Sequence, residues 1–99
     1  MFVRVWQYEV RGGREAEFLR VYGGDGTWAR LFARSDGFRG TELFRSVSDP
    51  RAFLTVDRFT SEQEFRWVLE RYGERYAAVD DAAAALTVSE HEIATGTQP

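Results

Sequence analysis

The chain has 99 residues, of which 43% are hydrophobic and 29% charged, and its net charge at pH 7 is −3. This length holds one domain and excludes a second. The arginines are interspersed with Asp and Glu, which argues against nucleic acid as a partner. There is no cysteine for a disulfide or thiolate site, and no apolar stretch of the ~20 residues that span a bilayer. The sequence predicts a soluble, cytoplasmic protein without membrane contact.

Aromatic side chains are abundant, with eight Phe, four Tyr and three Trp. A single sheet-and-helix core of this size cannot surround all of them on every side. Some are therefore expected to line a pocket or a subunit interface.

The first half of the chain predicts one strand and a divided helical region. Residues 2–10 alternate in the period-two pattern of a strand and are rich in β-branched and aromatic side chains. Helical spacing begins near Arg14, is interrupted by the glycine-rich residues 23–26, and resumes until Asp36-Gly37. We expect two short helical pieces here.

The second half predicts a hairpin, a helix and a last strand. Residues 38–47 and 52–60 are strand-like and flank a turn with Asp49-Pro50. Ser61 and Glu64 fit a capping box, so a second helix starts near Glu62, with a bend or break at Gly73. Residues 86–94 predict the final strand. We expect a single domain over residues 1–95 and a flexible tail over 96–99.

The predicted order β-α-β-β-α-β is that of the α+β ferredoxin-like fold, a four-stranded antiparallel sheet with both helices on one face. The other face is then bare. The alternation places Val5, Leu43 and Val56 on it, and such an apolar patch predicts a homodimer.

Three segments carry a family resemblance: R-G-G-R-E-A-E-F (Arg11 to Phe18), D-G-F-R-G-T-E-L-F-R (Asp36 to Arg45) and F-T-S-E-Q-E-F (Phe59 to Phe65). They resemble matching positions of the antibiotic-biosynthesis-monooxygenase family, over nearly the whole chain. The resemblance implies a dimeric α+β barrel with two sheets face to face and a ligand cavity in each subunit. Some members are cofactor-independent monooxygenases of polycyclic phenols and quinones, and others degrade haem.

The positions that matter to the haem-degrading branch differ here. Its Trp, its ligand His and its strand-one Asn fall at Val68, Ala78 and Trp6. The resemblance therefore implies no haem degradation, and no cofactor is expected. The quinone-oxidising branch relies on Asn, Trp and Tyr side chains, and no motif of that branch matches this chain residue by residue. His91 is the sole histidine, so no metal site is expected either.

One predicted sheet face mixes charged and aromatic side chains. Its members on alternate strand positions are Arg4, Trp6, Tyr8, Glu42, Phe44, Thr55, Asp57 and Phe59. Buried charges need partners, so this face is either a ligand pocket with polar anchors or a structural Arg–carboxylate network. In the pocket interpretation Arg4, Tyr8 and Asp57 are the catalytic candidates. The expected lining residues are Trp6, Glu42, Phe44 and Phe59. Tyr72 and Tyr76 from the second helix could also reach the pocket, although their place on its apolar stripe favours core packing.

The sequence thus predicts a monooxygenase-like protein that oxidises a small phenolic or quinoid compound without a cofactor. Two alternatives stay open. The protein is a non-catalytic dimer that binds a small hydrophobic ligand or serves a stress response, or the face with Arg4, Glu42 and Asp57 is a dimer seam and no pocket exists.

Overall fold

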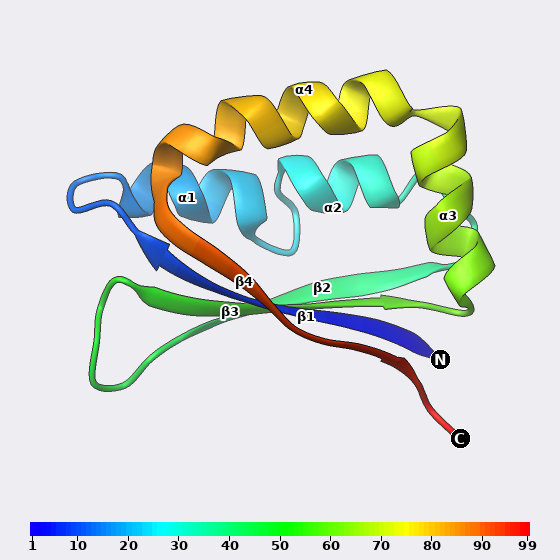
Figure 1. The fold of residues 1–99 in the computed structure, drawn as a ribbon, viewed down its shortest axis with the longest axis horizontal. Coiled ribbons are helices and arrows are strands. Elements are labelled where there is room, and N and C mark those ends of the chain that lie inside the picture. Colours follow the sequence, from blue (N-terminus) through cyan, green and yellow to red (C-terminus); the bar gives the residue numbers. More distant parts are fainter.

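The computed structural model describes residues 1–99 and confirms the α+β ferredoxin-like order, with each helical region divided in two (Figure 1). The elements are β1 (Phe2–Val10), α1 (Glu15–Tyr22), α2 (Thr27–Phe32), β2 (Phe38–Arg45), β3 (Ala52–Phe59), α3 (Glu62–Arg71), α4 (Gly73–Ala83), a 3-10 turn (Ala84–Leu86) and β4 (Thr87–Thr97).

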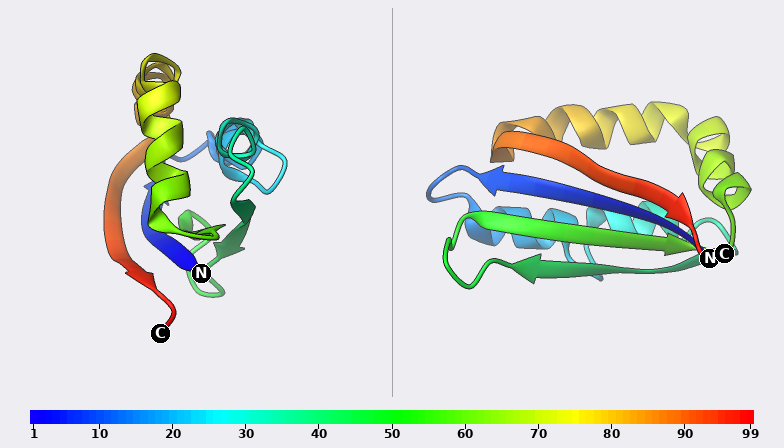
Figure 2. Two further views of the ribbon diagram at one scale, coloured as in Figure 1. Left: turned by 90° about the vertical axis from the view of Figure 1, so that its right-hand side faces the viewer. Right: turned by 60° about the horizontal axis from the view of Figure 1, so that its bottom comes forward.

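The four strands form one antiparallel sheet in the order β2-β3-β1-β4. All four helices lie on one face of this sheet, and the other face is uncovered (Figure 1). The left view of Figure 2 shows the helices as two separate stacks, α1 with α2 and α3 with α4. None of the helices is long and apolar enough to cross a membrane.

The core between sheet and helices is largely aromatic. Phe18 and Phe59 are fully buried, and Phe18 stacks on Tyr22 with 4.3 Å between ring centroids. Burying one such side chain contributes about 1.5–3 kcal/mol. On β1 the large apolar side chains of Phe2, Tyr8 and Val10 occupy alternate positions and all point into the core. Their burial therefore determines which face of the sheet packs against the helices.

A bulge at the start of β2 changes the predicted face of that strand. Phe38 pairs with Phe59 but Gly40 pairs with Arg58, so Arg39 is an extra residue, and Gly40 has the left-handed φ of 111° that glycine tolerates. The side chains after the bulge change sides. Leu43, predicted on the uncovered face, packs against the core, whereas Glu42 and Phe44 lie on the uncovered face.

The uncovered sheet face, called the open face below, carries apolar cross-strand pairs. Val5 pairs with Val56, and Phe44 pairs with Leu54. Phe44 remains 47% exposed. An ion pair between Glu42 and Arg58 lies on the same face.

Two further expectations need correction. Ser61 is the N-cap of α3 in extended conformation, but its side chain makes no capping hydrogen bond. The Glu64 carboxylate accepts a hydrogen bond from Ser35 Oγ at 2.8 Å instead of from the start of its own helix, so the predicted capping box does not form. The final strand runs beyond the predicted Ala94. Gly96 and Thr97 pair with β1, and the Gln98 N–H donates to the Met1 carbonyl at 2.9 Å, so the expected tail over 96–99 is largely part of the sheet.

Candidate functional site

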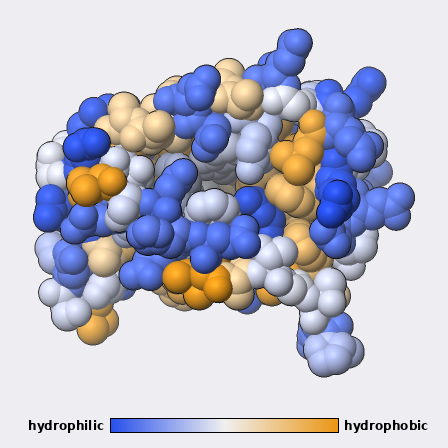
Figure 3. Space-filling model, viewed as in Figure 1, coloured by the Kyte–Doolittle hydropathy of each residue, from blue (hydrophilic) through white to orange (hydrophobic).

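A cavity lies between the sheet and the helices, and Figure 3 shows the molecule hollowed between α4 and β4. Its volume is about 50 Å³, small beside the several hundred Å³ of an ordinary ligand site. Its lining residues come from seven elements: Arg4, Trp6, Tyr8, Tyr22, Trp28, Phe32, Thr41, Thr55, Asp57, Tyr76, Asp80 and Glu90.

The floor of the cavity is built by cross-strand pairing. Arg4 lies directly opposite Asp57, and Trp6 opposite Thr55, on β1 and β3. Side chains at alternate positions of a strand point to the same face, so Arg4, Trp6 and Tyr8 follow one another beneath the helices. In the roof, the rings of Trp28 and Tyr76 meet edge to face at 4.9 Å, which joins α2 to α4.

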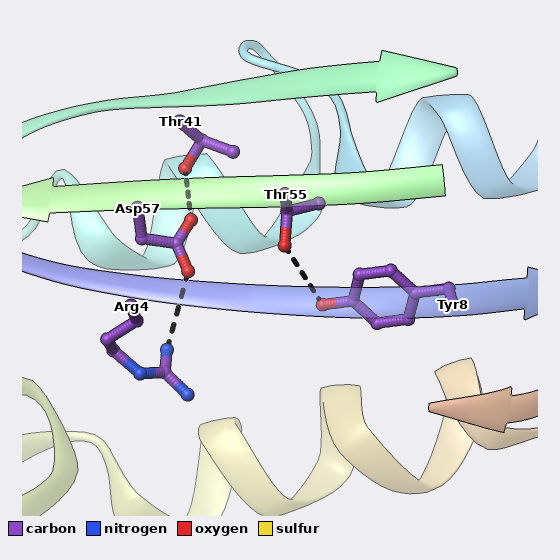
Figure 4. Close-up of polar contacts among 5 residues, drawn as sticks. All are labelled: Arg4, Tyr8, Thr41, Thr55 and Asp57. Atoms are coloured by element: carbon purple, nitrogen blue, oxygen red, sulfur yellow. Dashed lines mark hydrogen bonds and ion pairs between the residues drawn. The ribbon is translucent and has the colours of Figure 1, made fainter. Parts of the chain in front are cut away.

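A buried polar network crosses three strands (Figure 4). Arg4 Nη1 donates to Asp57 Oδ2 at 3.4 Å, and Thr41 Oγ1 donates to Asp57 Oδ1 at 2.7 Å. Arg4 is 8% exposed and Asp57 6%. The Arg4 guanidinium also lies 4.2 Å from the ring centroid of Phe65 on α3, a cation–π contact that fixes its position.

Burial raises the pKa of Asp57 above its ordinary value, and the hydrogen bond from Thr41 and the charge of Arg4 oppose the shift only in part. The single Arg4 contact is long for a charge-assisted hydrogen bond. Asp57 therefore has a stronger tendency to hold a proton than an exposed aspartate.

The tyrosines of the cavity are hydrogen-bond donors at neutral pH. Tyr8 shares a 3.1 Å hydrogen bond with Thr55 Oγ1 (Figure 4). Burial raises the pKa values of Tyr8, Tyr22 and Tyr76 above the ordinary value of 10.0. Each phenol therefore stays protonated and can donate to an oxygen of a bound molecule.

Two buried donors in the cavity wall have no acceptor. They are the indole Nε1 atoms of Trp6 and Trp28. A buried N–H without a partner costs about 1–3 kcal/mol, and few such groups occur in native proteins. An oxygen atom of a ligand could accept either hydrogen bond.

The exposed members of the lining are two carboxylates, Asp80 on α4 and Glu90 on β4. They mark the mouth of the cavity. Partial burial raises the pKa of Glu90, and the nearby charge of Asp80 raises it further.

The model of the family described as antibiotic biosynthesis monooxygenase matches residues 1–71. The chain belongs to this family. No curated protein matches it significantly.

Solved structures of family members have the same fold. A variant of SnoaB, a cofactor-independent oxygenase from Streptomyces nogalater, is 25% identical over 98% of this chain and 91% of its own, with a TM-score of 0.80. A candidate antibiotic biosynthesis monooxygenase from Deinococcus radiodurans is 14% identical over 100% and 93% of the two chains, with a TM-score of 0.79. At that identity the second likeness shows the fold alone.

In this family member the structure brings together five of the predicted site residues: Arg4, Trp6, Tyr8, Asp57 and Tyr76. They lie beneath helices of their own chain and line a cavity, so the alternative in which the face with Arg4, Glu42 and Asp57 is a dimer seam without a pocket does not hold for Arg4 and Asp57.

Four predicted lining residues lie elsewhere. Glu42 and Phe44 are on the open face because of the Gly40 bulge, and Phe59 is fully buried in the core. Tyr72 lies outside the cavity, where its ring packs against Trp67 and beneath Arg34.

The prediction of the site missed Tyr22, Trp28 and Phe32 in the roof, and Asp80 and Glu90 at the mouth. Trp28 and Phe32 have the i, i+4 spacing of one helix face, but that spacing does not distinguish a cavity wall from a filled core. No group of three or more His, Cys, Asp or Glu side chains is arranged to hold a metal ion.

Proposed function

We propose that this protein oxidises a small phenolic or quinoid compound in the cavity, without a cofactor. The observation that carries the proposal is the wall itself, in which aromatic rings surround two unpartnered indole donors and a buried Arg4–Asp57 pair. The similarity to SnoaB, a cofactor-independent oxygenase, supports the same chemistry.

The reaction balances without an external reductant. A phenol and one molecule of oxygen give a quinone and water: one oxygen atom bonds to the ring carbon, the other leaves as water, and the phenol supplies all four electrons. The protein has to promote loss of the phenolic proton and stabilise the anion, because the anion reduces oxygen more readily than the neutral phenol. Asp57 is the proposed proton acceptor, and Arg4 with the Tyr8 hydroxyl is proposed to stabilise the phenolate.

The volume of about 50 Å³ requires the cavity to widen when the substrate enters. Helix α4 is the wall suited to move, since Ala83 is its one fully buried residue, while Tyr76 and Val79 are half-buried. Outward movement of α4 would separate Tyr76 from Trp28 and enlarge the mouth.

Oxygen consumption with a panel of naphthols, anthrones and alkyl hydroquinones tests the proposal. We expect substrate-dependent uptake that yields water rather than hydrogen peroxide, since peroxide indicates simple autoxidation. Tyr8→Phe should lower kcat at least tenfold, whereas Tyr72→Phe, the same change outside the cavity, should leave kcat unchanged. Uptake that is equal in both variants contradicts the proposal.

A second candidate function is binding without turnover. The narrow cavity and the buried Arg4–Asp57 pair favour it, since a structural pair needs no substrate. Saturable binding of a phenol without oxygen uptake supports this alternative.

We further propose a homodimer formed through the open face. Val5, Phe44, Leu54 and Val56 supply the apolar surface, and the Glu42–Arg58 pair lies among them. Obligate interfaces are rich in such apolar surface.

A further inference from the structure

The polar groups of the cavity are divided between its wall and its mouth. The wall carries hydrogen-bond donors without acceptors, the indole N–H groups of Trp6 and Trp28. The mouth carries acceptors without cations, because neither Asp80 nor Glu90 has an ion-pair partner. A ligand that suits both the wall and the mouth must carry a hydrogen-bond acceptor at its inner end and a group without negative charge at its outer end.

We propose that the cavity selects phenolic ligands without an acidic substituent: an oxygen atom of the ligand enters toward the indoles, and a neutral or cationic group stays at the mouth. This inference rests on the proposed function and names the substrate class of the same cavity.

The indoles determine the inner end of the ligand. Trp28 is 8% exposed and comes from α2, whereas Trp6 comes from β1, so two different elements each contribute a lining residue whose buried indole N–H has no acceptor. Aromatic walls favour a flat ring, and the indole donors favour a ring that carries a carbonyl or phenolic oxygen. An ammonium group at that end has no lone pair and would leave both N–H groups without an acceptor.

The charges determine the outer end. The cavity has one guanidinium, Arg4, against the three carboxyl groups of Asp57, Asp80 and Glu90, and Arg4 already contacts Asp57. No cation of the lining is left to attract an anionic group at the mouth. A carboxylate there meets the repulsion of Asp80 and Glu90, whereas an ammonium group is attracted by both.

Binding of three 1-naphthols that differ only in the substituent on the second ring tests the inference. The substituent is a methyl ester, a carboxylate or an aminomethyl group, and quenching of tryptophan fluorescence measures Kd. In the natural protein we expect the carboxylate to bind at least tenfold more weakly than the ester, as an unscreened charge repulsion at short range implies. The aminomethyl compound should bind at least as tightly as the ester.

Variants assign the effect to the mouth. Asp80→Asn combined with Glu90→Gln should bring the affinities of ester and carboxylate to within threefold of each other. The matched control, Asp81→Asn combined with Glu74→Gln, removes the same charge from exposed positions of α4 outside the cavity and should leave the tenfold gap.

Oxygen uptake with the same three naphthols separates this inference from the proposed oxidation. Equal affinities for ester and carboxylate, or a gap that survives the mouth substitutions, overturn the inference even where uptake proceeds. Binding in the expected order without uptake supports the inference and contradicts the oxidation. Failure of all three compounds to bind overturns the inference as well.

Discussion

Arg4 and Asp57 are direct cross-strand neighbours whose side chains meet at 3.4 Å while both residues are more than nine-tenths buried. The pair lies in the floor of the cavity rather than on the open face. Desolvation of two buried charges offsets most of their attraction, so such a pair adds little to stability by itself. Its position in the cavity floor therefore matters more than its contribution to stability.

Removal of one partner should nevertheless be costly. Arg4→Met leaves the Asp57 carboxylate buried without its cation, and we expect the free energy of unfolding at pH 7 to fall by about 3–5 kcal/mol. Arg58→Met breaks the exposed pair with Glu42 and should cost about 1 kcal/mol or less. Urea unfolding followed by circular dichroism measures both values. Similar losses in the two variants would show that Arg4 is not paired in a buried site.

The raised pKa of Asp57 predicts a pH dependence of stability. The folded state holds this proton more tightly than the unfolded chain, so the stabilising contribution is complete below the ordinary pKa of 3.8 and is lost as the pH rises through the folded-state pKa. Asp57→Asn removes this dependence. The unfolding free energy of the variant minus that of the natural protein should therefore increase as the pH is raised from 4 to 7.

Unfolding at four pH values within this range checks the sign. Asp25→Asn, on an exposed loop, corrects for the general effect of removing one carboxyl. A difference that decreases with pH would mean that the Arg4 charge outweighs the burial of Asp57.

Much of the fold could be predicted from the pattern of single residues. Glycine runs at 12–13 and 23–26 end or divide elements, and the alternation of Phe2 to Val10 defines the strand. These signals are local, because backbone freedom and side-chain periodicity act over a few residues. The same strand alternation correctly predicted that Arg4, Trp6, Tyr8 and Asp57 lie on one face of the sheet, the face that meets the helices.

What escaped prediction depends on contacts between distant residues. The Gly40 bulge moves Glu42 and Phe44 to the opposite face, and its position is set by pairing with β3 rather than by the β2 sequence alone. Asp80 lies on α4 and Glu90 on β4, and both line the mouth of the cavity because β4 lies at the sheet edge near α4. No local pattern reports such an arrangement.

The bulge itself can be tested with an alanine scan of two glycines. Gly40 has a φ of 111° with open space around it, so Gly40→Ala should lower the free energy of unfolding by about 1–3 kcal/mol through backbone strain alone. Gly96, also in a strand and also without a neighbour within 4 Å, has no positive φ. Gly96→Ala should be neutral or stabilising by up to about 1 kcal/mol. Equal effects of the two substitutions in urea unfolding would argue against a strained bulge.

Because the cavity is narrow, ligand entry requires a helix to move away from the sheet, and we expect α4 to do so more readily than the rest of the fold. Because this helix buries little apolar surface, its backbone amides should exchange with solvent faster than those of β1 and β3. Hydrogen exchange read by mass spectrometry measures this, and a bound naphthol should protect α4 selectively. Protection of α4 equal to that of the sheet in the free protein would contradict entry of the ligand beneath this helix.

The proposed dimer predicts a sharp response to one charge on the open face. Val56 pairs with Val5 and is half-buried in the isolated chain, so Val56→Glu would place a carboxylate inside the interface without a partner. We expect this variant to be monomeric at concentrations at which the natural protein is dimeric in sedimentation equilibrium. Val47→Glu makes the same change in the exposed turn before Asp49 and should leave the dimer intact. A dimer that survives Val56→Glu would place the interface away from the open face, and circular dichroism of the variant verifies that the subunit remains folded.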